Sequence, residues 1–324
     1  MKHLAIFVVP VALLAMMASG VDGETAPAIR APQLGGVFQE QTRQLRLIEG
    51  IAGAASLGKA VAVGAPVEQA WLAPSARRAV VRLGGDSPRL AVADWRNEEI
   101  VMGSDLLPSS ADALALSPSA TAFALLMAGK VQVWMIGAGQ LSLIWSAEAP
   151  DATSIAVNDS GSAVALFGVS KVTVMDSSGR SSVLMEMEQL GAMTLSTGSR
   201  FAVAGADSSK ATIFEDVFSG PGSEITWESS GERVTALSFS GDNRQLIVGT
   251  SLEEGGSVRI ASVDGRRQSA VSMPVPVLEL LRAQGNAVYQ ISSSAKGIIY
   301  MIDADAVEPQ VFVVPGIAGV NINE

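Results

Sequence analysis

Related segments recur along the chain about every 42 residues, and this periodicity restricts the fold more than any other feature of the sequence. Residues 236–265, ALSFSGDNRQLIVGTSLEEGGSVRIASVDG, contain three short runs of alternating apolar and polar residues, separated by turn-forming Ser, Gly, Asp and Asn. Similar segments begin at Ala70, Ala113, Ser154, Ala192 and Val277. The last apolar residues before their first turns are Leu72, Leu116, Val157, Leu195, Phe239 and Leu281, with spacings of 44, 41, 38, 44 and 42.

A fourth, weaker run follows in each unit, for example LSLIWSA at 141–147, SSVLMEM at 181–187, SEITWES at 223–229 and QVFVVPG at 310–316. Four short antiparallel strands repeated at this interval are typical of the blades of a β-propeller. The sequence therefore predicts an all-β fold in which residues 34–324 form a single propeller domain. We expect the first strands to line the central channel. They are apolar or carry Ser and Thr, and Glu279 is their one acid.

The ends of the chain bear on the number of blades. Residues 316–322, GIAGVNI, resemble an extra first strand with nothing after it, and N-terminal strands are expected near 36–39, 44–49 and 59–64. Joining both termini in one blade removes the open edges that a linear stack would leave. We therefore favour seven blades, the last closed by N- and C-terminal strands. Six blades with an N-terminal extension is the alternative.

The turns SPSA (117–120), NDSG (158–161), STGS (196–199) and SGDN (240–243) each precede an apolar second strand. They resemble the Ser-Pro-Asp-Gly turns of the WD-repeat-like, YVTN-type superfamily of propellers, and the resemblance covers residues 66–316. The chain departs from the WD-repeat pattern because the Trp-Asp pair that ends a third strand is replaced by sequences such as VWMI, TVMD and RIAS. The resemblance thus implies the fold, at the level of the superfold, and no particular activity.

The N-terminus has the features of a secretory signal peptide. Lys2 and His3 precede an uncharged apolar run to Met17, and the small residues Ala18 and Gly20 mark a cleavage site. We expect residues 1–20 to be removed, residues 21–33 to form a flexible segment, and the protein to be periplasmic or extracellular. No later segment is long and apolar enough to span a bilayer, so we expect no membrane insertion after cleavage.

Loss of this segment would remove His3, the single His, and the chain has no Cys. Ser-His-Asp triads, Cys-His pairs and His- or Cys-based zinc sites are then excluded. Of the 22 Lys and Arg residues, Lys2 is also lost, which leaves 21 against 32 Asp and Glu. The remaining basic residues are scattered, so nucleic acid is not an expected partner.

Carboxylates are the remaining groups for acid–base chemistry. Asp159, Asp242, Asp264, Asp303 and Asp305 all fall in expected turns, where Asp accepts backbone N–H bonds. Two functional alternatives for such residues are a carboxylate pair of a hydrolase and an oxygen-ligand calcium site. We favour the turn role, because no Asp-x-Asp-x-Asp-Gly loop is present.

A basic residue recurs just before the third strand of successive units, where one face of a propeller would present it. These residues are Arg89, Lys130, Lys171 and Lys210, then Ser257 in place of a cation, with Lys296 one position early. Acidic residues in the connections between units, including Glu148, Glu186 and Glu232, are expected on the same face. Glu253 and Glu254 occupy the longest loop there. This face is the predicted binding face for a protein or small ligand, and solvated surface charge is the plainer alternative.

These observations favour an exported, non-catalytic propeller that serves as a binding scaffold and needs no cofactor. The alternative is a carboxylate-dependent propeller hydrolase or lactonase that uses calcium.

Overall fold

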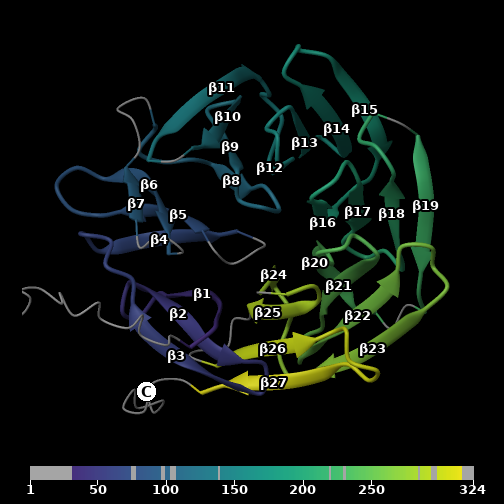
Figure 1. The fold of residues 1–324 in the computed structure, drawn as a ribbon. Helices are drawn as coiled ribbons and strands as arrows, with labels where there is room; N and C mark the ends of the chain where they lie inside the picture. The colour runs from purple at the N-terminus through teal and green to yellow at the C-terminus, as the bar shows by residue number, and fades with distance from the viewer. Residues whose placement is uncertain are drawn as a thin grey trace, which may run out of the picture. The chain divides into compact units, whose positions relative to one another are not determined.

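The computed structural model describes residues 31–73, 78–95, 99–102, 107–137, 139–218, 220–228, 231–283, 285–292 and 298–315 (Figure 1). The unit that begins at Pro32 consists of seven antiparallel sheets arranged in a ring. The predicted seven-bladed β-propeller is therefore confirmed. Within the described residues, no helix is long and apolar enough to cross a membrane.

The blades follow one another in the order of the sequence. Blade 1 contains β1 (Gln33–Gln39), β2 (Gln44–Ile51) and β3 (Ala54–Ala60); blade 2, β4 (Val67–Leu72), β5 (Arg78–Leu83), β6 (Arg89–Asp94) and β7 (Glu99–Met102); blade 3, β8 (Ala113–Leu116), β9 (Ala122–Met127), β10 (Lys130–Ile136) and β11 (Leu141–Glu148); blade 4, β12 (Ser154–Val157), β13 (Ala163–Gly168), β14 (Lys171–Asp176) and β15 (Ser181–Glu186). Blade 5 contains β16 (Leu190–Leu195), β17 (Phe201–Gly205), β18 (Lys210–Phe214) and β19 (Pro221–Thr226); blade 6, β20 (Arg233–Phe239), β21 (Gln245–Ser251), β22 (Gly256–Ser262) and β23 (Gln268–Met273); blade 7, β24 (Glu279–Arg282), β25 (Val288–Ser292), β26 (Ile299–Asp303) and β27 (Gln310–Val314).

Blade 1 has three described strands, and their register shows which positions they fill. β1, β2 and β3 each begin 45 residues before β5, β6 and β7, the second, third and fourth strands of the next blade. The first position of blade 1 is the one predicted for residues 316–322, which lie outside the described residues. The prediction of a strand over 59–64 is wrong. β2 and β3 are joined by a tight turn at Gly53 (φ 84°), and Leu57 pairs with Ile48, so β3 ends at Ala60.

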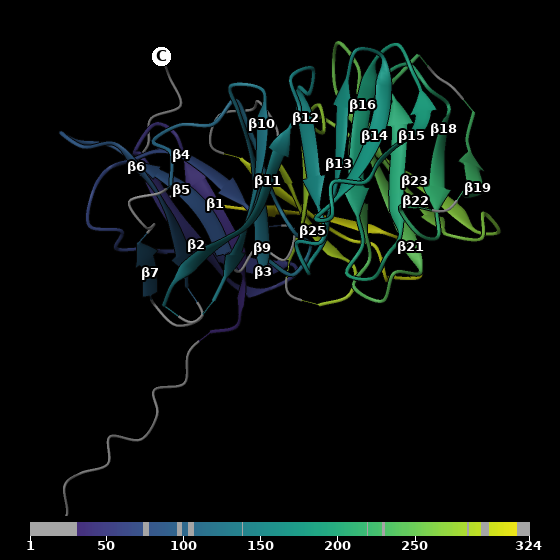
Figure 2. The same cartoon turned by 90° about the horizontal axis from the view of Figure 1, so that it is seen from above.

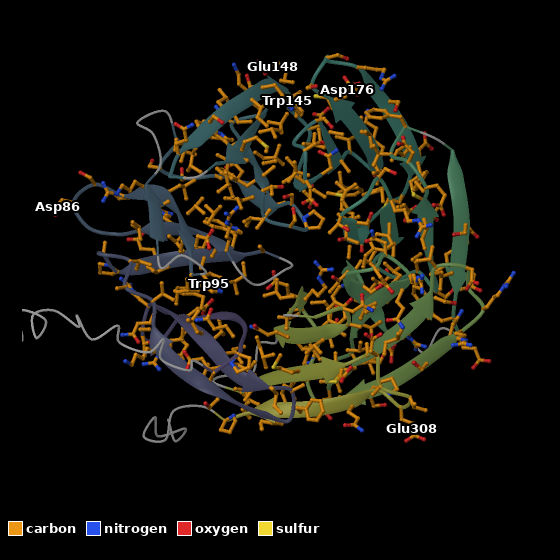
Figure 3. The ribbon with its side chains drawn as sticks, viewed as in Figure 1. Asp86, Trp95, Trp145, Glu148, Asp176 and Glu308 are labelled. Carbon is orange, nitrogen blue, oxygen red and sulfur yellow. The ribbon has the colours of Figure 1, made fainter. Side chains whose placement is uncertain are left out.

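The hydrophobic core lies between neighbouring blades and is filled mainly by their second and third strands. In blade 3, the rings of Phe123 and Trp134 are stacked with their centroids 6.3 Å apart. Both side chains are fully buried against Leu90 and Val92 of blade 2. Outer strands are less buried, and Trp145 on β11 is half-buried with its Nε1 donating to the Gly161 carbonyl at 2.6 Å (Figure 3). Burial between adjacent sheets therefore holds the blades together.

The strands of each blade run between two faces of the ring (Figure 2). The lysine face carries the loops between second and third strands, next to Lys130, Lys171 and Lys210, together with the connections between blades. The turn face carries the loops between first and second strands, such as 196–200 and 240–244, and those between third and fourth strands. Two hairpins on the lysine face are very tight, since Ala128, Gly129, Val169 and Ser170 all have positive φ.

Candidate binding channel and its two faces

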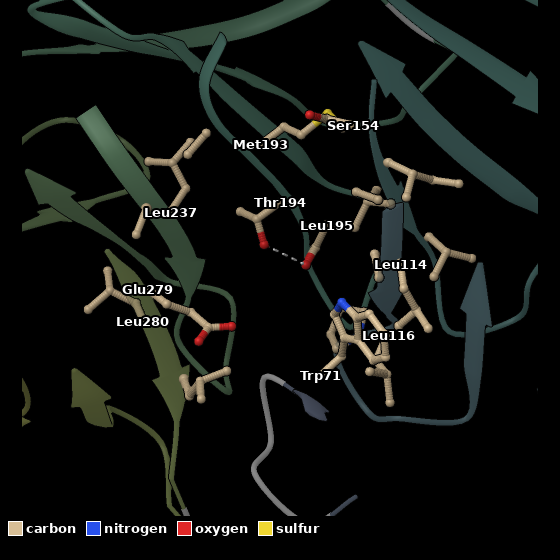
Figure 4. Close-up of a pocket in the computed structure, with 18 of the residues that line it drawn as sticks. Trp71, Leu114, Leu116, Ser154, Met193, Thr194, Leu195, Leu237, Glu279 and Leu280 are labelled. Atoms are coloured by element: carbon tan, nitrogen blue, oxygen red, sulfur yellow. Dashed lines mark hydrogen bonds between the residues drawn. The ribbon is translucent and has the colours of Figure 1, made fainter. Parts of the chain in front are cut away.

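The first strands of blades 2 to 7 surround a central cavity of about 330 Å³ (Figure 4). This volume is at the lower end of the range of small-molecule sites. Most of the lining residues are aliphatic. Leu114 and Met193 are partly exposed, whereas Leu116, Leu237 and Leu280 are largely buried in the cores between blades and contribute little surface to the cavity (Figure 4). The sequence-based expectation that first strands line the channel with apolar and hydroxyl side chains is confirmed.

Glu279 is the one acidic side chain among the described residues that line this channel. It begins β24, next to the half-exposed Leu278, and its side chain is exposed to the channel. Trp71, on β4 of blade 2, lines the same channel (Figure 4). The sequence predicted this acid in a first strand. Glu279 places a negative charge in the channel near the lysine face, where β24 begins.

The predicted cations lie where the repeat placed them, each as the first residue of a third strand. Arg89, Lys130, Lys171 and Lys210 begin β6, β10, β14 and β18, and all four are exposed. Lys130 pairs with Glu148 at 3.1 Å and Lys210 with Glu224 at 2.7 Å, in both cases on the outer strand of the same blade. The cations are thus spread around the rim of the lysine face. Lys296 lies outside the described residues.

The loop that carries Glu253 and Glu254 is a short projection from β21 and β22. Both carboxylates and Leu252 are exposed, and the loop is closed by the Leu252 N–H donating to the Gly255 carbonyl at 2.9 Å. Gly255 has φ 88°, and a Cβ there would stand 2.7 Å from the Met273 carbonyl oxygen. The loop geometry therefore requires glycine at this position.

A buried polar cluster holds the base of this loop. The Glu232 carboxylate accepts hydrogen bonds from Thr250 Oγ1 at 3.0 Å, Ser257 Oγ at 2.9 Å and Arg259 Nη2 at 2.9 Å. The Glu232 and Arg259 side chains are only 11% and 19% exposed. Burial alone would raise the pKa of Glu232, but the hydrogen bonds from Arg259, Ser257 and Thr250 bring it below its ordinary value. Ser257 stands where other blades have a cation, and its hydroxyl donates to this carboxylate.

On the turn face, Asp242 is engaged within its own turn. Its carboxylate accepts from Ser240 Oγ at 2.7 Å and from the Arg244 N–H at 3.1 Å. Burial alone would raise the pKa of Asp242. The two hydrogen bonds and the nearby positive charge of Arg244 outweigh it, so the pKa lies below its ordinary value. Asp264 acts in the same way with Ser262 and Arg266. The structure shows both carboxylates in the turn role that the sequence favoured.

Successive turns on this face are also hydrogen-bonded to each other across blades. Asp159 in blade 4 accepts from the Ser119 N–H of blade 3 at 2.7 Å. Arg200 of blade 5 donates to the Asn243 carbonyl of blade 6 at 2.7 Å. The Asp242 N–H donates to Asn286 Oδ1 of blade 7 at 2.8 Å. Sequence analysis missed these links, because each joins residues about one repeat apart.

A small polar cleft lies where the channel meets the turn face. Its volume is about 10 Å³, close to the space of one water molecule. It shares Pro118, Thr194 and Leu195 with the apolar channel, so the two are continuous. Its polar lining includes Ser196, Ser238 and Arg282, none of which the sequence singled out.

Among the described residues, no group of three or more His, Cys, Asp and Glu side chains is placed to hold a metal ion. No protein-family model matches the chain, and no curated protein matches it. The fold is therefore known from the structure, and function has to be argued from the channel and the two faces.

Proposed function

We propose that this chain is an exported, non-catalytic β-propeller that acts as a binding scaffold, with the lysine face as the surface that meets a protein or small-ligand partner. The observation that supports it best is the preorganised loop of Glu253 and Glu254. Its exposed carboxylates are carried by a closed turn, and the buried Glu232 cluster fixes both strands that lead into it. A surface that is ordered before binding loses less entropy on association.

Charge indicates what kind of partner this loop would favour. Two adjacent carboxylates beside the exposed Leu252 would complement a basic partner with an apolar contact point. The rim cations Lys130 and Lys210 are paired with carboxylates of their own blades, whereas Glu253 and Glu254 form no ion pair with another described residue.

The test is charge reversal. We expect Glu253→Lys/Glu254→Lys to weaken capture of a specific partner from envelope extracts at least tenfold. The matched control is Glu308→Lys, which reverses an exposed carboxylate in the connection between β26 and β27 on the turn face. Equal capture by wild type and by the Glu253/Glu254 variant would remove the loop from the proposal.

Export is tested separately by fractionating cells and sequencing the mature N-terminus, which is expected at Val21. A protein that stays in the cytoplasm with Met1 retained would contradict this part. A rise in Tm with calcium that a chelator reverses would favour the calcium-dependent hydrolase over the scaffold, since a ligand specific for the folded state stabilises it.

A further inference from the structure

The cleft at the turn-face end of the channel places a positive charge at the bottom of a cavity whose lining residues are mostly aliphatic. Arg282 ends β24, is half-buried, and lines the cleft beside Ser196 and Ser238. Within the described part of the chain, its guanidinium has no carboxylate within ion-pairing distance and makes no hydrogen bond. Every other arginine on the described turn face donates to a carboxylate or carbonyl or lies at the exposed rim.

Two buried hydroxyls add hydrogen-bond donors to this charge. Ser238 is 4% exposed, and its hydroxyl forms no hydrogen bond with another described residue. Ser196 is 1% exposed, and its Oγ accepts from the Gly198 N–H at 3.1 Å and the Arg200 N–H at 3.2 Å. Because its lone pairs are used, the Ser196 proton remains to be donated. The Ser238 oxygen is not among the fully buried unpaired side-chain atoms of the described residues, so it keeps access to the cleft, where it can bond a water molecule or a ligand.

Gly241 makes room for the guanidinium. A Cβ on Gly241 would stand 2.7 Å from Arg282 Nη1, so any side chain there would displace the arginine. The neighbouring carboxylates of Asp242 and Asp305 form hydrogen bonds with residues other than Arg282. Asp242 accepts from Ser240 and Arg244, and Asp305 accepts from Asn286 Nδ2 at 3.1 Å and is exposed. Among the described residues that line the cleft, Arg282 is therefore the one cation, and the lining includes no carboxylate.

The channel that opens into the cleft determines what else a molecule bound at Arg282 could contain. It is lined by aliphatic side chains from all six described first strands, and burying the apolar part of a ligand against them favours binding. We propose that the channel binds a small amphiphilic carboxylate, with its apolar body between the first strands and its carboxylate on Arg282, Ser238 and Ser196. An arginine with two hydroxyl donors matches a carboxylate, because charge-assisted hydrogen bonds are about twice as strong as neutral ones.

This site is independent of the partner proposed for the lysine face. The cleft is small in the free protein, so we expect the Arg282 side chain to shift as a head group enters. Glu279, near the other end of β24, would disfavour a carboxylate there and so favours a single orientation of the ligand, with its charge toward the turn face.

The experiment compares three probes of equal chain length, octanoate, 1-octanol and octylammonium, by isothermal titration calorimetry on the full mature protein. We expect octanoate to bind at least tenfold more tightly than the other two. Arg282→Gln should abolish this preference and Arg282→Lys should restore part of it. Ser238→Ala should weaken octanoate several-fold. Arg244→Gln is the matched control, since Arg244 lies on the same face with its side chain 84% exposed, and it should bind octanoate as wild type does.

Four results would overturn the proposal: no binding of octanoate, equal affinity for octanoate in Arg282→Gln and wild type, tighter binding of octylammonium, or equal affinity for acetate and octanoate. The last would mean that only the head group is recognised. Tm values without ligand show whether each variant is folded. Partner capture by the lysine face is measured on the same variants, and it should be unchanged if the two sites are separate.

Discussion

Removing the Glu232 carboxylate should destabilise the propeller more than any exposed charge change. Glu232→Ala leaves the guanidinium of Arg259, 19% exposed, without its counter-ion, and two hydroxyls without their acceptor. Breaking a largely buried ion pair by deleting one partner costs about 3 kcal/mol. At about 2 °C per kcal/mol for a domain of this size, Tm should fall by about 6 °C. Glu232→Gln keeps an oxygen acceptor and should cost about 1–2 kcal/mol.

The pH dependence gives a second, sharper measurement. The pKa of Glu232 in the folded protein is below its ordinary value of 4.5. Its stabilising contribution is therefore complete above about pH 4.5 and is lost as the pH falls through the lower folded-state pKa. Urea unfolding of wild type and Glu232→Gln should differ at pH 7, and the two should converge as the pH falls below 4.5.

The control is Glu224→Gln, which removes the partner of Lys210 where both side chains are 49% exposed. It should change stability by less than about 1 kcal/mol. The cluster does not hold the loop if Glu232→Ala has the same Tm as wild type, or if the difference in unfolding free energy between wild type and Glu232→Gln persists unchanged below pH 4.5.

Three further predictions follow from packing and register. Arg78→Met removes a guanidinium that lies 2.5 Å from the Asp94 carboxylate, 3% exposed, and should lower the urea-unfolding free energy by about 3 kcal/mol; an unchanged midpoint would contradict it. Gly241→Ala should reduce octanoate affinity at least fivefold, because the new Cβ would stand 2.7 Å from Arg282 Nη1. Asn286 Oδ1, at 3.2 Å, has to give by only a few tenths of an ångström, so Tm should stay within about 2 °C of wild type; retained affinity would argue against the placement of Arg282. Deleting residues 316–324 should lower Tm and increase aggregation, since the predicted first strand of blade 1 is lost and one edge of β1 is left unpaired. Identical Tm values for the truncated and the full-length protein would refute closure of the ring by this segment.

The sequence predicted the features that depend on one repeat at a time. Alternation and turn residues placed strands such as β9 and β13, and they identified the SGDN stretch as a bend. The Ala-rich segment around Leu57 was placed wrongly, because its small residues give little periodicity and the tight turn at Gly53 sets the register. The Arg282 cleft could not be anticipated, since its lining comes from blades 3, 5, 6 and 7 and the Arg282 guanidinium lies where a side chain on Gly241 would be.

The hydrogen bonds between successive turns have a consequence for how this ring can be rebuilt. Arg200 of blade 5 donates to the backbone carbonyl of Asn243 in blade 6. The backbone N–H of Asp242 in blade 6 donates to the side-chain amide oxygen of Asn286 in blade 7. Each repeat is therefore matched to the neighbour that follows it, and the repeats are not interchangeable modules. The cyclic order of the blades matters, whereas the place where the chain starts does not. Circular permutants opened at an exposed loop such as 252–255 should fold, and chains with two repeats exchanged should not.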